Sequence, residues 1–131
     1  MDYVIKEVIV GTFTTSCQIE NSIDRGKSIT ISKILVDTGS ELSWISAKDL
    51  EKIGIQREKK DLTFVMANGQ KITRSVGFAL IRIENYFTID EVVFAEEGDL
   101  LLLGARTLEG MNLIVDPVKK KIVAAGPLPA A

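Results

Sequence analysis

The residues best suited to chemistry stand at the end of a short, continuous apolar run. Residues 34–36 read Ile-Leu-Val, and Asp37, Thr38, Gly39 and Ser40 follow at once. The run predicts a strand that enters the core, where an aspartate is costly unless its oxygens are hydrogen-bonded. Catalysis is one reason to place an aspartate there. Two carboxylates a few ångströms apart share a proton, so that one acts as general base on water while the other polarises a carbonyl group.

The composition removes several other kinds of catalytic site. The chain has no histidine and one cysteine, Cys17. A Ser-His-Asp or Cys-His arrangement therefore cannot be built, and neither can a histidine-ligated zinc site, a cysteine-rich metal site or an intrachain disulfide. We expect no metal and no organic cofactor.

Charge and hydropathy limit the kinds of partner that the protein can have. The net charge is −2, from 16 basic and 18 acidic residues interspersed along the chain. Nucleic-acid binding needs clustered positive charge, so we expect no nucleic-acid partner and interpret the lysines at 119–121 as a solvated turn. Residues 1–7 lack a signal-peptide pattern, and no apolar run is long enough to span a bilayer. The sequence therefore predicts a soluble, cytoplasmic protein with no membrane partner.

The elements that would position Asp37 are mostly strands. The dipeptide Asn68-Gly69 separates two β-prone runs and predicts a hairpin, because both residues tolerate positive φ. Runs rich in β-branched and aromatic residues predict strands at 4–10, 28–32 continuing into 34–36, 63–67, 71–83, 86–94, 113–115 and 121–123.

Two short helices complete the expected fold. One begins at Ser46 with the pattern of a capping box and ends before Gly54; the other spans residues 105–109 and stops near Gly110. No linker or repeat divides the chain. We expect one mainly β domain over residues 1–131, with one or two short helices and a soft tail at 126–131.

Three segments, in order, resemble the retropepsin-like aspartic proteases. Residues 36–40 (Val-Asp-Thr-Gly-Ser) match the family signature of an apolar strand followed by Asp-Thr/Ser-Gly-Ala/Ser. Residues 64–72 stand where the family has its flap hairpin, and residues 101–109 look like its late apolar-glycine-helix element. The segment from 108 to 118 and its Gly-Pro-Leu-Pro tail are similar to small prokaryotic members. The resemblance covers almost the whole chain and implies an acid-protease half-barrel with a flap hairpin.

The resemblance also implies a homodimer. The chain has one Asp-Thr-Gly loop and length for one lobe, so a pair of aspartates requires two copies of Asp37 across a two-fold axis. In the family, threonine hydroxyls brace the two loops, which would be the role of Thr38. Family members also interleave terminal strands at the interface, and residues 3–10 and 113–123 are the candidates. The implied activity is an aspartic endopeptidase acting on peptide or protein substrates.

The resemblance assigns roles to particular residues. The catalytic residues would be Asp37, Thr38 and Gly39, and the substrate-binding residues would be Gly39, Ser40, Glu41, Ala67, Asn68 and Gly69. The last three would form the tip of a flap that closes over substrate.

Three neighbouring side chains carry more specific predictions. A Ser40 hydroxyl that donates to Asp37 would stabilise its ionised form and shift the working range to lower pH. Arg106 stands one position later than the family's arginine; we interpret it as a surface residue, with a pair to Glu41 as the other reading. Trp44 is interpreted as a core residue or the wall of a substrate subsite.

Other interpretations remain open from the sequence alone. Asp37 could be a loop aspartate that caps nearby amides, and residues 67–69 could be an ordinary hairpin turn. The domain could be a retropepsin-like dimeric binding or scaffold domain without turnover. It could also be a monomeric β domain in which Asp-Thr-Gly has no catalytic meaning.

Overall fold

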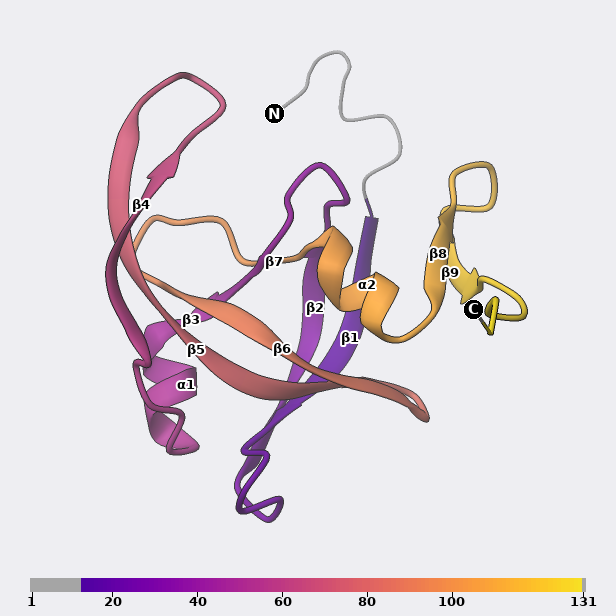
Figure 1. Ribbon diagram of the computed structural model, residues 1–131, viewed down its shortest axis with the longest axis horizontal. Coiled ribbons are helices and arrows are strands. Elements are labelled where there is room, and N and C mark those ends of the chain that lie inside the picture. Colours follow the sequence, from indigo (N-terminus) through magenta and orange to yellow (C-terminus); the bar gives the residue numbers. More distant parts are fainter. Residues whose placement is uncertain (1–12, 131) are drawn as a thin grey trace.

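The computed structural model describes residues 13–130 (Figure 1). The strand predicted at 4–10, and the interface role predicted for residues 3–10, lie outside the described residues. The described part holds nine strands and two short helices: β1 (Phe13–Glu20), β2 (Ser28–Val36), β3 (Ser43–Ser46), α1 (Ala47–Lys52), β4 (Lys59–Val65), β5 (Lys71–Ile83), β6 (Tyr86–Ala95), β7 (Leu102–Leu103), α2 (Ala105–Gly110), β8 (Leu113–Asp116) and β9 (Lys121–Ala124).

Seven of these strands form one sheet that curls back on itself. The strand order is β1-β2-β7-β3-β6-β5-β4, and an additional pairing between β1 and β5 joins distant strands of that order. The pairs β2–β7 and β3–β6 are parallel, whereas the other pairs are antiparallel. The predicted mainly β half-barrel with a long hairpin and two short helices is therefore confirmed. No helix among residues 13–130 is long and apolar enough to cross a membrane.

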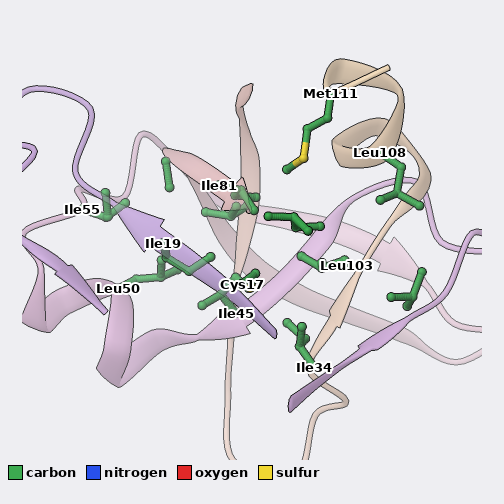
Figure 2. Close-up of a cluster of buried hydrophobic side chains, with 14 of the residues drawn as sticks. Cys17, Ile19, Ile34, Ile45, Leu50, Ile55, Ile81, Leu103, Leu108 and Met111 are labelled. Atoms are coloured by element: carbon green, nitrogen blue, oxygen red, sulfur yellow. The ribbon is translucent and has the colours of Figure 1, made fainter. Parts of the chain in front are cut away.

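The main hydrophobic core lies on the concave side of this sheet, where α1 and α2 close it (Figure 2). Each large aliphatic side chain buried there contributes roughly 1.5–3 kcal/mol. The core holds the buried ends of β2 and its neighbour β7 in place, and the Asp37 loop emerges from β2. Its labelled members are Cys17, Ile19, Ile34, Ile45, Leu50, Ile55, Ile81, Leu103, Leu108 and Met111.

A second, smaller apolar cluster lies against the β4–β5 hairpin. Its centre is Trp44, which is 8% exposed and packs with Val76 and Leu102. Phe64 of β4 and Ile72 of β5 pack against this centre from the hairpin. The hairpin is therefore joined to the strand that follows the Asp37 loop by apolar contact. The prediction that Trp44 is a core residue is confirmed.

The sequence missed three strands, β1, β3 and the two-residue β7, and placed β4 at 63–67 instead of Lys59–Val65. β1 reads Phe-Thr-Thr-Ser-Cys-Gln-Ile-Glu, and its many polar residues obscure an alternation in which only Cys17, Ile19 and Glu20 are buried. β3 is four residues long and contains a buried serine, Ser43, so it has no apolar run to detect. Strand pairing at both edges of β3, rather than local propensity, places it in the sheet.

The helix predictions are confirmed apart from one detail. α1 begins after Ser46, but Ser46 makes no side-chain capping hydrogen bond, so the predicted capping box is wrong. Gly54 has φ +79°, as expected of a residue that ends a helix. α2 spans the predicted segment and its N-terminal boundary is Gly104. The strands β8 and β9 form the expected hairpin, and the lysines at 119–121 are exposed at its turn.

Candidate active site

The buried strand β2 brings Asp37 to the surface. Val36 is 2% exposed, and it pairs in parallel with Leu103 of β7. One residue later the backbone N–H of Asp37 donates to the carbonyl oxygen of Leu103 at 3.0 Å. Asp37 itself is half-buried, and Thr38 and Gly39 after it are exposed. A carboxylate is therefore presented to solvent from the end of a rigid, buried strand.

The Asp37 side chain is oriented by its own loop. Its Oδ1 atom accepts a hydrogen bond from the backbone N–H of Gly39 at 3.0 Å, and its carbonyl oxygen accepts one from the N–H of Ser40 at 3.1 Å. A Cβ atom at Gly39 would lie 3.1 Å from that same Oδ1. Within residues 13–130, Oδ2 accepts no hydrogen bond. One oxygen is fixed and the other is available to a water, a substrate or a second carboxylate.

The loop is also held by the segment that enters α2. The N–H of Ala105 donates to the carbonyl oxygen of Ser40 at 2.7 Å, and the N–H of Arg106 donates to that of Glu41 at 3.1 Å. Gly104 packs so closely that an added Cβ would lie 2.5 Å from the carbonyl oxygen of Leu42. Only glycine fits there without displacing the backbone of the Asp37 loop. The late apolar-glycine segment is thus a support for this loop.

A buried polar chain, which the sequence did not reveal, lies behind this contact. The N–H of Gly104 donates to Ser43 Oγ at 2.9 Å, and Ser43 Oγ lies 2.6 Å from Thr107 Oγ1. Thr107 Oγ1 in turn donates to Asp90 Oδ2 at 3.1 Å. Ser43 and Thr107 are both 0% exposed, so their hydroxyls have only each other and these neighbours as partners. The chain ties β3, β6 and α2 together beneath the Asp37 loop.

The β4–β5 hairpin ends in a tight turn. The N–H of Met66 donates to the carbonyl oxygen of Gln70 at 2.8 Å, and Gly69 has φ +85°. Asn68 does not share the positive φ; instead its Oδ1 accepts the N–H of Gln70 at 2.9 Å. The predicted hairpin is confirmed, with a longer turn than the Asn-Gly pair alone would make. Ala67, Asn68 and Gly69 are all exposed at its tip.

Two contacts fix the hairpin to the rest of the sheet. The first is the edge-to-face packing of Phe64 on Trp44, with ring centroids 5.3 Å apart. The second is an ion pair: Arg74 Nε and Nη2 donate to Asp99 Oδ2 and Oδ1 at 2.7 and 2.8 Å. The two side chains are 14% and 13% exposed. Hydrogen bonds from Arg74 lower the pKa of the Asp99 carboxyl below its usual value.

The structure therefore brings the predicted site residues together in two groups. Asp37, Thr38, Gly39, Ser40 and Glu41 form one loop between β2 and β3. Residues 67–69 form the tip of the β4–β5 hairpin. Both groups project to the same side of the sheet (Figure 1). No hydrogen bond joins the two groups in the described part of the chain.

The structure corrects the prediction for Ser40 and decides between the two interpretations of Arg106. The Ser40 hydroxyl donates to the carbonyl oxygen of Leu42 at 2.9 Å, so it braces the loop and does not reach Asp37. The structural reason for expecting a lowered working pH is therefore gone. Arg106 pairs with Glu91 at 3.3 Å and not with Glu41, because the helix directs it towards β6. Its side chain is 43% exposed, as expected of a surface arginine.

The lone cysteine of the chain is not part of this site. Cys17 is 3% exposed on the core side of β1, and burial raises the pKa of its thiol to about 12. It is therefore a protonated core residue and no nucleophile. Over residues 13–130, no three or more aspartate, glutamate, cysteine or histidine side chains gather as a metal site would require.

The sequence of this site matches a known family. Residues 25–110, about two thirds of the chain, match the family described as gag-polyprotein putative aspartyl protease. The chain belongs to this retropepsin-like aspartyl protease family. The region that matches the aspartyl protease family contains the Asp37 loop, the β4–β5 hairpin and α2, which are the three segments that carried the resemblance in the sequence. No curated protein matches the chain.

Proposed function

We propose that this member of the aspartyl protease family is an endopeptidase, active as a homodimer in which two copies of Asp37 form the catalytic pair. The orientation of Asp37 carries the proposal. Its Oδ1 is held by the N–H of Gly39 at the end of a buried strand, while Oδ2 has no partner within residues 13–130. Hydrolysis by carboxylates needs two of them close together, and the chain has one Asp-Thr-Gly loop. A second copy related by a two-fold axis supplies the other.

The reaction then follows from a shared proton. Two adjacent carboxylates cannot both ionise easily, so one Asp37 is protonated and the other is not. The ionised carboxylate takes a proton from water as the water oxygen bonds to the scissile carbonyl carbon. The protonated carboxyl gives its proton to the carbonyl oxygen. The tetrahedral intermediate then collapses as its carbon–nitrogen bond breaks. The carboxyl that took the proton from water gives it to the leaving nitrogen, and the other carboxylate takes a proton from a hydroxyl of the intermediate, which releases an amine and a carboxylic acid.

The neighbouring residues position the substrate. Gly39, Ser40 and Glu41 line the exposed edge of the loop, where a peptide backbone would run past Asp37. The hairpin tip, residues 67–69, acts as a flap that closes over the peptide and excludes water from the reacting atoms. Thr38, exposed beside Asp37, braces the loop of the partner copy.

The C-terminal hairpin is the proposed centre of the dimer interface. β8 and β9 pair with each other in a separate two-stranded sheet, and their outer edges are unpaired among the described residues. Ile114 of β8 is 50% exposed. Unpaired strand edges with exposed apolar side chains are surfaces on which a second chain can add strands. Figure 1 shows this hairpin apart from the main sheet, on the far side of α2 from β5.

A subunit-mixing experiment tests the shared site. Wild-type chains are mixed with an equal amount of Asp37→Asn chains, left to exchange subunits, and assayed for peptide hydrolysis. With random pairing, half of the wild-type chains end up in mixed dimers, which contain one Asp37 and no catalytic pair. The activity per wild-type chain should therefore fall to about half. A matched mixture with Asp24→Asn, which changes an exposed aspartate in the β1–β2 turn, should keep the full activity. Unchanged activity in the first mixture would overturn the shared site.

A further inference from the structure

Three large apolar side chains lie exposed together on the outer face of the β5–β6 ribbon. Phe78, Phe87 and Ile89 are 41%, 52% and 58% exposed. In the antiparallel pairing, Leu80 stands opposite Ile89 and Arg82 opposite Phe87. Directly opposed residues point to the same side of a sheet, so these side chains form adjacent rows on one face. We call Phe78, Phe87 and Ile89 the ribbon patch; Leu80 lies on the same face but is only 2% exposed.

Contacts between α2 and the opposite face of the ribbon explain why the ribbon patch faces outward. Thr88 stands between Phe87 and Ile89 and points to the other side, where Gly110 of α2 packs against it. Asp90 also points there, since it accepts the hydrogen bond from Thr107. Because strand side chains alternate, Phe87 and Ile89 must face away from the core.

A pair of cations borders the patch at Phe78. Lys59 Nζ lies 5.8 Å from the centroid of the Phe78 ring and forms an ion pair with Glu91 at 2.8 Å. Arg106 joins the same carboxylate at 3.3 Å. The cations are the exposed partners: the Lys59 and Arg106 side chains are 49% and 43% exposed, against 17% for Glu91.

The border at Phe87 repeats this arrangement. Arg82 stacks over the Phe87 ring, with its Cζ atom 4.9 Å from the centroid, and pairs with Glu20 at 3.0 Å. Arg25 pairs with Glu20 at 2.9 Å. Glu20 is 9% exposed, whereas Arg82 and Arg25 are 23% and 54% exposed. On each side, two outward cations surround one largely buried carboxylate, so the rim presents positive charge on a chain whose net charge is −2.

We propose that the ribbon patch is a docking surface for an acidic segment of a partner protein that carries bulky apolar side chains. The apolar centre binds those side chains, and the cationic rim attracts and orients the carboxylates around them. A second copy of this chain fits poorly, because two like-charged rims would face each other. Nucleic acid also fits poorly, because two cations beside one carboxylate leave a net charge of only +1 at each border, whereas phosphate binding needs clustered positive charge.

Three synthetic peptides of equal length test the docking surface. The first alternates Asp and Glu with Phe and Leu, the second replaces its acidic residues by Lys, and the third replaces its apolar residues by Ser. Each is titrated into the ¹⁵N-labelled full chain, in wild-type and Asp37→Asn forms, while backbone amide shifts are followed. We expect only the first peptide to bind, with shifts concentrated at residues 78–91 and an affinity that falls as salt is raised.

A surface variant locates the binding. Phe87→Ser with Ile89→Ser removes two exposed side chains and should weaken the first peptide at least about tenfold. The matched control, Leu100→Ser with Leu128→Ser, removes apolar side chains that are 69% and 72% exposed elsewhere and should leave the affinity unchanged. Equal binding of the lysine peptide would overturn the proposal, as would shifts confined to residues 37–41 and 66–70. The proposal would also be overturned if the ribbon variant still bound the first peptide but no longer dimerised. The same holds if that variant kept the peptide but lost binding to anionic vesicles or to an oligonucleotide that the wild type bound.

Because the readout is a chemical shift, it does not require hydrolysis. A chain that binds the acidic peptide at the ribbon patch but cleaves nothing would keep the docking surface and reject the endopeptidase.

Discussion

The backbone N–H of Asp37 donates to the carbonyl oxygen of Leu103 at 3.0 Å. This bond joins the loop that carries the candidate catalytic carboxylate to a strand encoded much later in the chain. Just before this bond along both segments, β2 and β7 pair in parallel. Just after it, Gly104 packs closely against Leu42. The position of the carboxylate is therefore determined by two segments together, and changes in the later one should disturb the site without touching Asp37.

Replacement of Gly104 tests this support. In Gly104→Ala, the new Cβ would meet the carbonyl oxygens of Leu42 and Glu41 at 2.5 and 2.7 Å, which are backbone atoms that cannot turn aside. We expect the free energy of unfolding in urea to fall by about 2 kcal/mol or more. In the control Gly26→Ala, the nearest atom would be 3.5 Å away, and the change should stay within about 0.5 kcal/mol. Equal effects of the two substitutions would contradict the account.

The buried hydroxyl chain should contribute measurably to stability. Thr107→Val keeps the shape of the side chain but removes the hydroxyl that links Ser43 to Asp90. Two buried polar groups then lose a partner, so unfolding should become easier by about 2 kcal/mol. Thr63→Val, the same change at an exposed position of β4, should be nearly neutral. A neutral Thr107→Val would mean that water or rearrangement replaces the lost bonds.

The Arg74–Asp99 pair should hold the hairpin in place. Asp99→Asn weakens a bidentate, largely buried ion pair, so we expect a loss of about 2 kcal/mol in unfolding free energy and faster hydrogen exchange at the amides of residues 66–72. Arg25→Gln removes an arginine that is 54% exposed and leaves Glu20 paired with Arg82, so its effect should be below about 1 kcal/mol. Unchanged hydrogen exchange at the hairpin in Asp99→Asn would show that the packing of Phe64 on Trp44 is enough to hold the hairpin in place.

The same pair predicts the direction of a pH dependence. Arg74 lowers the folded-state pKa of the Asp99 carboxyl, so the pair's contribution is fully present above the ordinary aspartate pKa. It is lost as pH falls through the lowered, folded-state pKa. The stability difference between wild type and Asp99→Asn should therefore be largest near neutral pH and shrink in acid. A difference that grows as pH falls would contradict the assignment.

The proposed dimer interface is tested by one charge. Ile114→Glu places a carboxylate on the exposed face of β8 and should convert the dimer to folded monomers, as measured by sedimentation at several concentrations. Ile23→Glu, at a turn residue that is 95% exposed, serves as the control and should sediment as wild type does. A folded Ile114→Glu dimer of unchanged affinity would place the interface elsewhere.

The sequence predicted the elements whose chemistry is local. The apolar run before Asp37, the Asn-Gly turn and the glycine before α2 all depend on neighbouring residues, and each is where it was expected. Most of what escaped prediction depends on partners distant in the chain or on the exact loop conformation. Ser43 and Thr107 are 64 residues apart, and no spacing rule connects them. The Ser40 hydroxyl could reach either Asp37 or the Leu42 carbonyl, and only the loop conformation decides between them.

The sequence did not predict that Phe87 and Ile89 of β6 face outward, and the reason is related. Phe87 and Ile89 alternate with Thr88 and Asp90, and alternation alone would bury the apolar pair. The hydrogen bond from Thr107 and the packing of Gly110 turn the polar pair inward instead. Side-chain partners on α2 thus outweigh the hydrophobic pattern of one strand.

Cleavage of a diverse peptide library, from about pH 3.5 to 7, tests the central claim most directly. Wild-type protein is compared with Asp37→Asn, which keeps the size of the side chain and removes its capacity to ionise. The account predicts that wild type cleaves peptides and that Asp37→Asn, equally folded and dimeric, cleaves none. Cleavage by both proteins would assign hydrolysis to another site or a contaminant, and cleavage by neither, from a proven dimer, would contradict the endopeptidase and leave a binding domain of the same fold.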